Sequence, residues 1–264
     1  MGLFKKIQAG RAAKRLRGAS ASQDGSLGEL QSELVNLGPE AVRSVLQSLR
    51  SVDGRQAAIE VLERLVNDST LPVFLEALAS PDPDIVAGVT TVLSNAKNYD
   101  PACLLALFEN PRVSKARLET LLSAQMTRIS PRTLIAALPG MSRESRAVVF
   151  RILEARADST IVAEATHLAT HSDWWLRLHM VKLLCRCPSP EGTATIVRLL
   201  NDENRSVRLE AVQDVGKLKA AEAIPALCQS LREPDIKIQT AAIDALIQIH
   251  DVTAVPHLIE VLKD

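Results

Sequence analysis

Thiol and imidazole side chains are the groups of this chain best suited to chemistry, and their spacing argues against a catalytic or metal site. Cys185 and Cys187 flank Arg186, but residues two apart on a helix point about 200° away from each other, so these thiols cannot easily hold one ion. The nearby histidines show no ligand spacing with a carboxylate: His167, His171 and His179. Nucleophile-elbow, zinc-protease and phosphate-loop motifs are also missing from the sequence. It therefore predicts no catalytic residue, no metal and no cofactor.

A stripe of aromatic and basic residues stands out near position 180. Its members fall at i, i+4, i+7 and i+11 and so share one helical face: Trp175, His179, Lys182 and Arg186. We call it the Trp175 stripe. Aliphatic neighbours such as Leu176 and Val181 already supply a separate buried face.

Trp and Arg are the residue types most enriched at binding hot spots. We therefore expect the Trp175 stripe, joined by Arg151 from the unit before it, to bind a partner. A partly packed tryptophan among ordinary solvated charges is the alternative. Of the adjacent tryptophans, we expect Trp174 to be the packed one.

The elements that must position these residues repeat with a period of 31 residues. Val207 and Ala211 recur as Ile238 and Ala242 in the next unit. A fixed period in this range is typical of stacked repeats. One position of the 31-residue repeat is an arginine in three successive repeats. We call these residues the arginine ladder: Arg146, Arg177 and Arg208. Two interpretations stay open, contacts to anions or pairing with acids and carbonyls of neighbouring units.

The apolar residues keep helical spacing between breaks that recur every 12 to 16 residues, and no strand-like alternation occurs. We therefore predict an all-α fold, an α-solenoid of about seven helix pairs with an unpaired helix over 253–264 and a leading helix over 27–37. The pairs are expected over 38–67, 69–98, 99–127, 130–157, 160–189, 191–220 and 222–251. Four acids or amides should cap the second helices: Asp84, Asp173, Asn204 and Asp235.

Residues 206–233 resemble the HEAT-repeat consensus, in the variant also found in phycobilisome-lyase-type repeats. The features that match are Val207–Arg208, Ala211–Val212, Val215–Gly216, and Ile224–Pro225 with Leu227 and Leu231. The likeness is strong over about 140–264 and weaker back to about 38. It implies that the helix pairs are HEAT-like, that second helices line a concave groove holding the Trp175 stripe, and that the arginine ladder supports the stack.

Charge is uneven along the chain although it sums to zero. Six of the 31 basic residues and none of the 31 acids lie in 1–23, which leaves about −6 for 24–264 and disfavours nucleic acid as a partner. We expect residues 1–26 to be a solvated basic arm with a flexible linker, and 27–264 to be the solenoid. A weak contact of the arm with an anionic membrane or acidic partner is the second interpretation, through Leu3, Phe4, Lys5, Lys6 and Ile7.

The unpaired last helix should leave Leu258, Val261 and Leu262 partly uncovered. We therefore expect either that the solenoid continues past Asp264 or that an oligomer covers this end. Four cysteines and the lack of an 18-residue apolar run indicate a cytoplasmic protein, free or peripheral to a membrane.

A non-catalytic scaffold or adaptor is the function that these features predict, in which the solenoid groove binds a protein that the sequence does not identify. The chain would then serve as the N-terminal module of a larger signalling or assembly protein. The resemblance also leaves an enzymatic alternative open, because helical-repeat proteins include bilin lyases and DNA glycosylases. A lyase would need a tetrapyrrole pocket, and a glycosylase a basic groove with a catalytic carboxylate.

Overall fold

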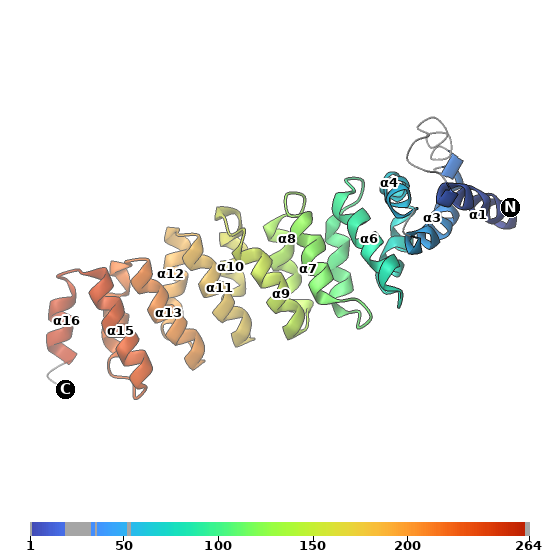
Figure 1. The fold of residues 1–264 in the computed structure, drawn as a ribbon. Helices are drawn as coiled ribbons and strands as arrows, with labels where there is room; N and C mark the ends of the chain where they lie inside the picture. The colour runs from blue at the N-terminus through green and yellow to red at the C-terminus, as the bar shows by residue number, and fades with distance from the viewer. Residues whose placement is uncertain (1, 19–32, 35, 52–53, 262–264) are drawn as a thin grey trace. The chain divides into compact units, whose positions relative to one another are not determined.

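The computed structural model describes residues 2–18, 33–34, 36–51 and 54–261. Contacts within the chain divide it into two compact units, unit 1 (Met1–Ile129) and unit 2 (Ser130–Asp264). Every regular element in the described residues is a helix (Figure 1). The all-α prediction is therefore confirmed.

Unit 1 begins with the helix α1 (Gly2–Gly18) and continues as alternating short and long helices. These are α3 (Pro39–Leu46) with η1 (Gln47–Arg50), α4 (Arg55–Leu65), α5 (Leu71–Ala77), α6 (Pro83–Asn95), η2 (Pro101–Glu109) and α7 (Lys115–Ala124). The three pairs α3–α4, α5–α6 and η2–α7 fall inside the first three ranges that the sequence predicts. Each short helix supplies the first layer of its pair and each long one the second.

Unit 2 repeats the same alternation. Its elements are α8 (Pro131–Ala137) with η3 (Leu138–Gly140), α9 (Arg143–Glu154), η4 (Ser159–Ile161) with α10 (Val162–Leu168), α11 (Trp174–Arg186), α12 (Pro190–Leu199), α13 (Arg205–Lys217), η5 (Ala221–Ala223) with α14 (Ile224–Ser230), α15 (Ile236–Ile249) and α16 (Ala254–Val261). In Figure 1 these helices follow one another in a row from α8 to α16. The α-solenoid of helix pairs with a last unpaired helix, α16, is thus confirmed.

Polar caps start several of the long helices where the sequence places a short acid or amide. The side chains of Asp173, Asn204 and Asp235 each accept a backbone N–H of the first helical turn. The cap of α6 differs from the prediction, because Asp82 and not Asp84 accepts the backbone N–H groups of Asp84 and Ile85, at 3.0 and 3.3 Å. Pro83 is suited to the first helical position, so the cap lies one residue before it.

Aliphatic side chains of neighbouring helices fill the interior of unit 2. Val207, Ala211 and Val212 of α13 are fully buried, as the repeat predicts. Helix α13 contacts α15, and α14 contacts α16. The approach of α15 to α13 is so close that a Cβ atom at Gly216 would stand 2.8 Å from the Cα of Ala245. Gly216 and Ala245 therefore set the spacing of α13 and α15.

The N-terminal segment differs from the solvated arm that the sequence predicts. Residues 2–18 form α1, which contacts α3, η1 and α4. Ala9, Ala12 and Ala13 are buried there. Alanine is the strongest helix former, and a stripe of alanines lets two helices approach closely. Such a stripe carries too little hydrophobicity to be noticed in sequence.

Some of the expectations for the N-terminal region fall outside the described residues. The proposed linker and most of the leading helix at 27–37 lie there, although Leu34 and Leu37 are described and buried. Among the described helices, none is long and apolar enough to cross a membrane.

Candidate interaction surfaces

Helix α11 brings the Trp175 stripe together on one face, with its aromatic half packed inward. The Trp175 ring is 8% exposed and stacks on the His179 ring, with centroids 3.5 Å apart. Phe150 of α9 meets both rings edge-on, at 4.3 Å from His179 and 6.3 Å from Trp175. His179 Nδ1 also hydrogen-bonds the backbone carbonyl of Trp175 at 2.7 Å. The three rings form one aromatic cluster between α9 and α11.

The roles of the two adjacent tryptophans are the reverse of those expected. Trp175 is buried, whereas Trp174 is half-buried with the guanidinium of Arg143 over its ring at 5.4 Å. Consecutive residues on a helix point about 100° apart, so sequence alone could not decide which ring faces α9. The expectation that Trp174 is the packed one was wrong.

Burial keeps the imidazole of His179 neutral. It lowers the pKa of His179 to about 4, and the positive charges of Lys182 and Arg143 act in the same direction, against the hydrogen bond to Trp175. A neutral ring suits stacking inside this aromatic cluster.

The basic half of the stripe reaches the neighbouring helices. Lys182 pairs with Glu210 of α13 at 3.6 Å, and Arg186 pairs with Glu154 of α9 at 3.7 Å. Arg186 is still more than half exposed, and Arg151 is exposed on α9. The basic residues of the stripe thus lie at the surface of unit 2, beside the buried aromatic cluster.

Each arginine of the ladder joins the turn after one short helix to an acid in the next helix pair of unit 2. Arg177 donates to the carbonyls of His171 and Ser172, at 2.8 and 2.9 Å, and to both oxygens of Asp202, at 2.7 and 2.8 Å. Arg146 and Arg208 make the same type of contact, with a turn carbonyl on one side and an acid about 25 residues later on the other. All three guanidinium groups are therefore occupied within unit 2.

The equivalent position in the next repeat holds Gln239, whose side-chain amide makes the contacts to turn carbonyls but not the ion pair. It donates to the carbonyls of Leu231 and Glu233, at 3.2 and 2.8 Å. A neutral amide can satisfy turn carbonyls, but it cannot pair with an acid of a following unit as an arginine does.

The four cysteines are free thiols, and none is activated. Burial, together with the nearby charge of Asp214, raises the pKa of Cys185 to about 11. Burial likewise raises the pKa of Cys187 and Cys228, and that of Cys103 to about 11. Such thiols are poor nucleophiles at neutral pH. Among the described residues, no three His, Cys, Asp or Glu side chains are grouped so that they could hold a metal ion.

The expected membrane-contact residues are described only in part. Ile7 is about half exposed on α1. The side chains of Leu3, Phe4, Lys5 and Lys6 lie outside the described residues. The membrane contact therefore stays a prediction.

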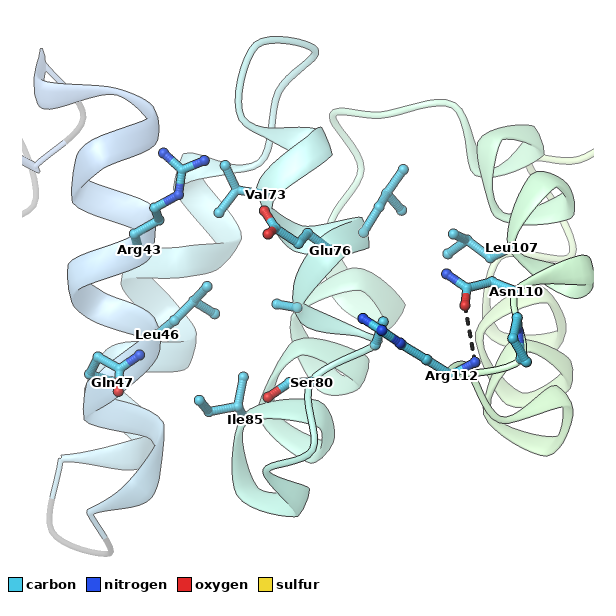
Figure 2. Close-up of a pocket in the computed structure, with 14 residues that line it drawn as sticks. Arg43, Leu46, Gln47, Val73, Glu76, Ser80, Ile85, Leu107, Asn110 and Arg112 are labelled. Carbon is cyan, nitrogen blue, oxygen red and sulfur yellow. Dashed lines mark hydrogen bonds between the residues drawn. The ribbon is translucent and has the colours of Figure 1, made fainter.

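A groove in unit 1, which sequence reasoning missed, lies between the short helices. Its volume is about 870 Å³, and α3, α5 and the end of η2 form its walls (Figure 2). The lining is largely aliphatic, from Leu46, Val73, Ala77, Ile85 and Leu107. We call it the α3–α5–η2 groove. No motif marks it, because its lining comes from positions spread over 43–112.

Ion pairs between neighbouring helix pairs of unit 1 fix the helix that forms the floor of this groove. Arg50 donates to Asp82, the cap of α6, at 2.6 Å, and Arg55 of α4 donates to Asp84 at 2.6 Å. Burial alone would raise the pKa of Asp82, but the hydrogen bonds from Arg50 and from the backbone of Ile85 and Asp84 lower it. The start of α6, and with it Ile85, is thereby fixed against η1 and α4.

Three charged side chains stand on the rim of the groove. Arg43 is paired weakly with Glu40 of its own helix, at 3.6 Å, with both groups exposed. Arg112 extends from the turn after η2 toward Ser80, and its guanidinium makes no ion pair or hydrogen bond with the described residues (Figure 2). Glu76 is the one acid in the described lining. The rim therefore offers an available cation beside an aliphatic floor.

Comparison with known proteins supports the repeat architecture. Residues 192–264 match the family model described as HEAT repeats, which is the region from α12 to the end of unit 2. None of the curated proteins matches the sequence.

Several solved structures are similar to the chain. One is an engineered protein, with 17% identity, 99% of this chain and 79% of that chain covered, and a TM-score of 0.46. Human deoxyhypusine hydroxylase in complex with glycerol has 14% identity, coverages of 94% and 98%, and a TM-score of 0.40. Importin beta has 17% identity, coverages of 86% and 37%, and a TM-score of 0.44. At these scores none of them transfers a ligand or an activity to this chain.

Proposed function

With HEAT repeats over residues 192–264 as the premise, we propose that this chain is a non-catalytic protein-interaction module. The observation that carries the proposal is the α3–α5–η2 groove, with its aliphatic floor and, at its rim, Arg112, whose guanidinium has no ion-pair partner among the described residues. Apolar clefts with a few placed polar groups are typical binding sites. The polar side chains in the described lining are Arg43, Gln47, Glu76, Ser80, Asn110 and Arg112.

The chemistry of the groove favours a polypeptide segment that combines aliphatic side chains with a carboxylate. Leu46, Val73 and Leu107 would contact the aliphatic side chains. Arg112 would pair with the carboxylate, because a guanidinium binds a carboxylate with two parallel hydrogen bonds. Glu76 on the same rim disfavours a segment with many acids.

A peptide library displayed on phage, selected against the full chain, tests this function. We expect selected peptides to combine Leu, Ile, Val or Phe with Asp or Glu. Arg112→Glu should weaken their binding about tenfold or more, which corresponds to about 1.4 kcal/mol. Lys97→Glu reverses an exposed charge of unit 1 that does not line the groove, and it should leave the affinity unchanged. Equal binding by wild type and Arg112→Glu would contradict the assignment to this groove.

The Trp175 stripe is the second surface that we propose for partner binding. Its support is the exposure of Arg186 and Arg151 beside the rigid Trp175–His179 stack, with Lys182 at the same surface. In this proposal the rings position the helix face, and the basic residues contact an acidic partner. A double variant with Lys182→Glu and Arg186→Glu should then lose a partner that Arg112→Glu retains. If the double variant retains every partner, the Trp175 stripe does not take part in partner binding.

A further inference from the structure

Helix α1 of unit 1 has two sides of different chemistry. Ala9, Ala12 and Ala13 are at most 2% exposed and form the packed side of this helix, which contacts α3 and α4. Residues three, four, seven and eight positions apart share one side of a helix. By this spacing four exposed residues form the side opposite the alanines, which we call the outer face of α1: Ile7, Arg11, Lys14 and Arg15.

The outer face carries a concentration of positive charge. Residues 1–23 contain six basic residues and no acid. Arg11 and Lys14 have no ion-pair partner among the described residues. Arg15 pairs with Glu33 at 3.9 Å, but both side chains are largely exposed, at 64% and 46%. An exposed pair at this distance is weak, so it leaves the charge of Arg15 available.

One aliphatic side chain stands among these cations. Ile7 is 47% exposed and lies one helical turn before Arg11 and two turns before Lys14. Gly10 is also exposed, and a Cβ atom there would meet no described atom within 4 Å. The outer face is therefore the smooth side of one helix, with cations placed around an aliphatic residue.

This combination fits the surface of an anionic bilayer better than the surface of an acidic protein. Lipid headgroups present negative charge over a whole surface, so each cation can find a partner without a matching cleft. The long side chains of the three cations can keep their charges among the headgroups while their methylene groups and Ile7 contact the boundary of the acyl chains. Protein interfaces depend instead on aromatic anchors that fill pockets, and the four residues include no aromatic.

We propose that the outer face of α1 binds the surface of an anionic lipid bilayer. The packing of the alanine side against α3 holds the cations in one orientation, so binding does not require a free arm to become ordered. Ile7 also belongs to the contact that the sequence predicts, whereas Arg11, Lys14 and Arg15 are added by the structure. The described lining of the α3–α5–η2 groove contains no residue of α1, so this contact and the proposed function can fail independently.

Co-sedimentation of the full chain with lipid vesicles tests the contact. The vesicles contain phosphatidylcholine alone or with about one third phosphatidylserine. We expect binding to the anionic vesicles only, weakened about tenfold or more when salt is raised from about 0.05 M to about 0.5 M, because salt screens exposed charges. Lys14→Glu should weaken this binding about fivefold or more, the effect of one charge near an anionic surface. Wild type that does not bind, or that binds both kinds of vesicle equally, would overturn the proposal.

Lys97→Glu is the matched control, because it makes the same exchange at another exposed lysine of unit 1, outside α1. It should bind the anionic vesicles within about twofold of wild type, since attraction to the bilayer falls off within a Debye length. Lysine and glutamate are both good helix formers, so Lys14→Glu keeps α1 helical, which circular dichroism checks. Equal loss of binding by the two variants would contradict the assignment to the outer face.

Poly-glutamate in place of the vesicles gives the remaining outcome. Binding of this polymer by wild type, lost in Lys14→Glu and accompanied by no vesicle binding, would assign the outer face to an acidic protein. That result would also overturn the proposal.

Discussion

At the residue scale, burial decides what the ionisable side chains of this chain can do. His179 is neutral because it is buried against Trp175, on which it stacks, and Phe150, which it meets edge-on. The thiol of Cys185 is protonated because it is partly buried near Asp214. Arg177 is occupied by two carbonyls and two acids. The histidine, cysteine and arginine side chains that suggest chemistry in sequence are used here for packing and for contacts inside the stack. Arg112, at the rim of the groove, is instead exposed at the surface.

The depressed pKa of His179 predicts a loss of stability at mildly acidic pH. The unfolded chain takes up a proton near pH 6.5, whereas the folded chain does so near pH 4. The stability that the neutral His179 ring contributes is therefore fully present above pH 6.5 and is lost as the pH falls toward 4. Allowing for partial exposure, we expect it to be on the order of 2 kcal/mol.

Urea unfolding of wild type and His179→Phe between pH 7 and pH 4 measures this contribution. Phenylalanine keeps a ring against Trp175 and Phe150 but does not titrate. The free energy of unfolding should fall more steeply with acidification in wild type than in the variant. Parallel curves would show that the His179 pKa is not depressed.

At the element scale, the spacing of α13 and α15 depends on small residues where these two helices cross. Gly216 of α13 faces the backbone of Ala245, so this position has no room for a side chain. In unit 1, a Cβ at Gly88 would meet the Leu49 methyl groups, which can move. The contact at Gly216 is therefore the more restrictive of the two.

Gly216→Ala should lower the free energy of unfolding by about 1–3 kcal/mol, because α15 must move to admit the methyl group. Gly10→Ala is the matched control within a helix. An alanine there meets no described atom within 4 Å and should raise stability by about 0.5–1 kcal/mol. Urea denaturation followed by circular dichroism gives both values. A gain in stability from Gly216→Ala would mean that α13 and α15 are not in close contact.

At the scale of the whole molecule, each helix pair depends on its immediate neighbours. The arginine ladder shows this in unit 2, because Arg177 connects the turn before α11 to Asp202 in the turn after α12. Repeat proteins of this type distribute stability as a series of local interfaces. Damage to one interface should therefore stay local.

Arg177→Met should increase amide hydrogen exchange in α11, α12 and α13 and leave α4 and α6 of unit 1 unchanged. The side chains of Arg177 and Asp202 are 7% and 5% exposed, and removal of one partner of a buried pair costs about 3–5 kcal/mol. Arg205→Met is the control, because Arg205 pairs with Asp235 at the surface and should have a much smaller effect. Exchange mass spectrometry resolves these segments. A uniform increase over both units would show instead that the chain unfolds as one cooperative body.

The repeat was predictable from sequence because it depends on local chemistry. The spacing of residues such as Val207 and Ala211 defines the buried side of a helix, and aspartates and prolines mark where helices begin. Two details of the same kind were missed. The Ala9–Ala13 stripe is too weakly apolar to distinguish a packed helix from a solvated arm, and Pro83 displaced the cap of α6 from Asp84 to Asp82.

The sequence by itself determined the periodic part of this protein, namely the helices, their pairing and the residues that face the interior. Only the tertiary structure decided which surfaces stay available. It turned Trp175 inward and left Trp174 half-buried, and it placed Arg112 beside an aliphatic groove. The physical reason is that periodicity records what each helix must bury. Exposure depends on neighbours brought close in space, which equivalent positions of a repeat do not all share.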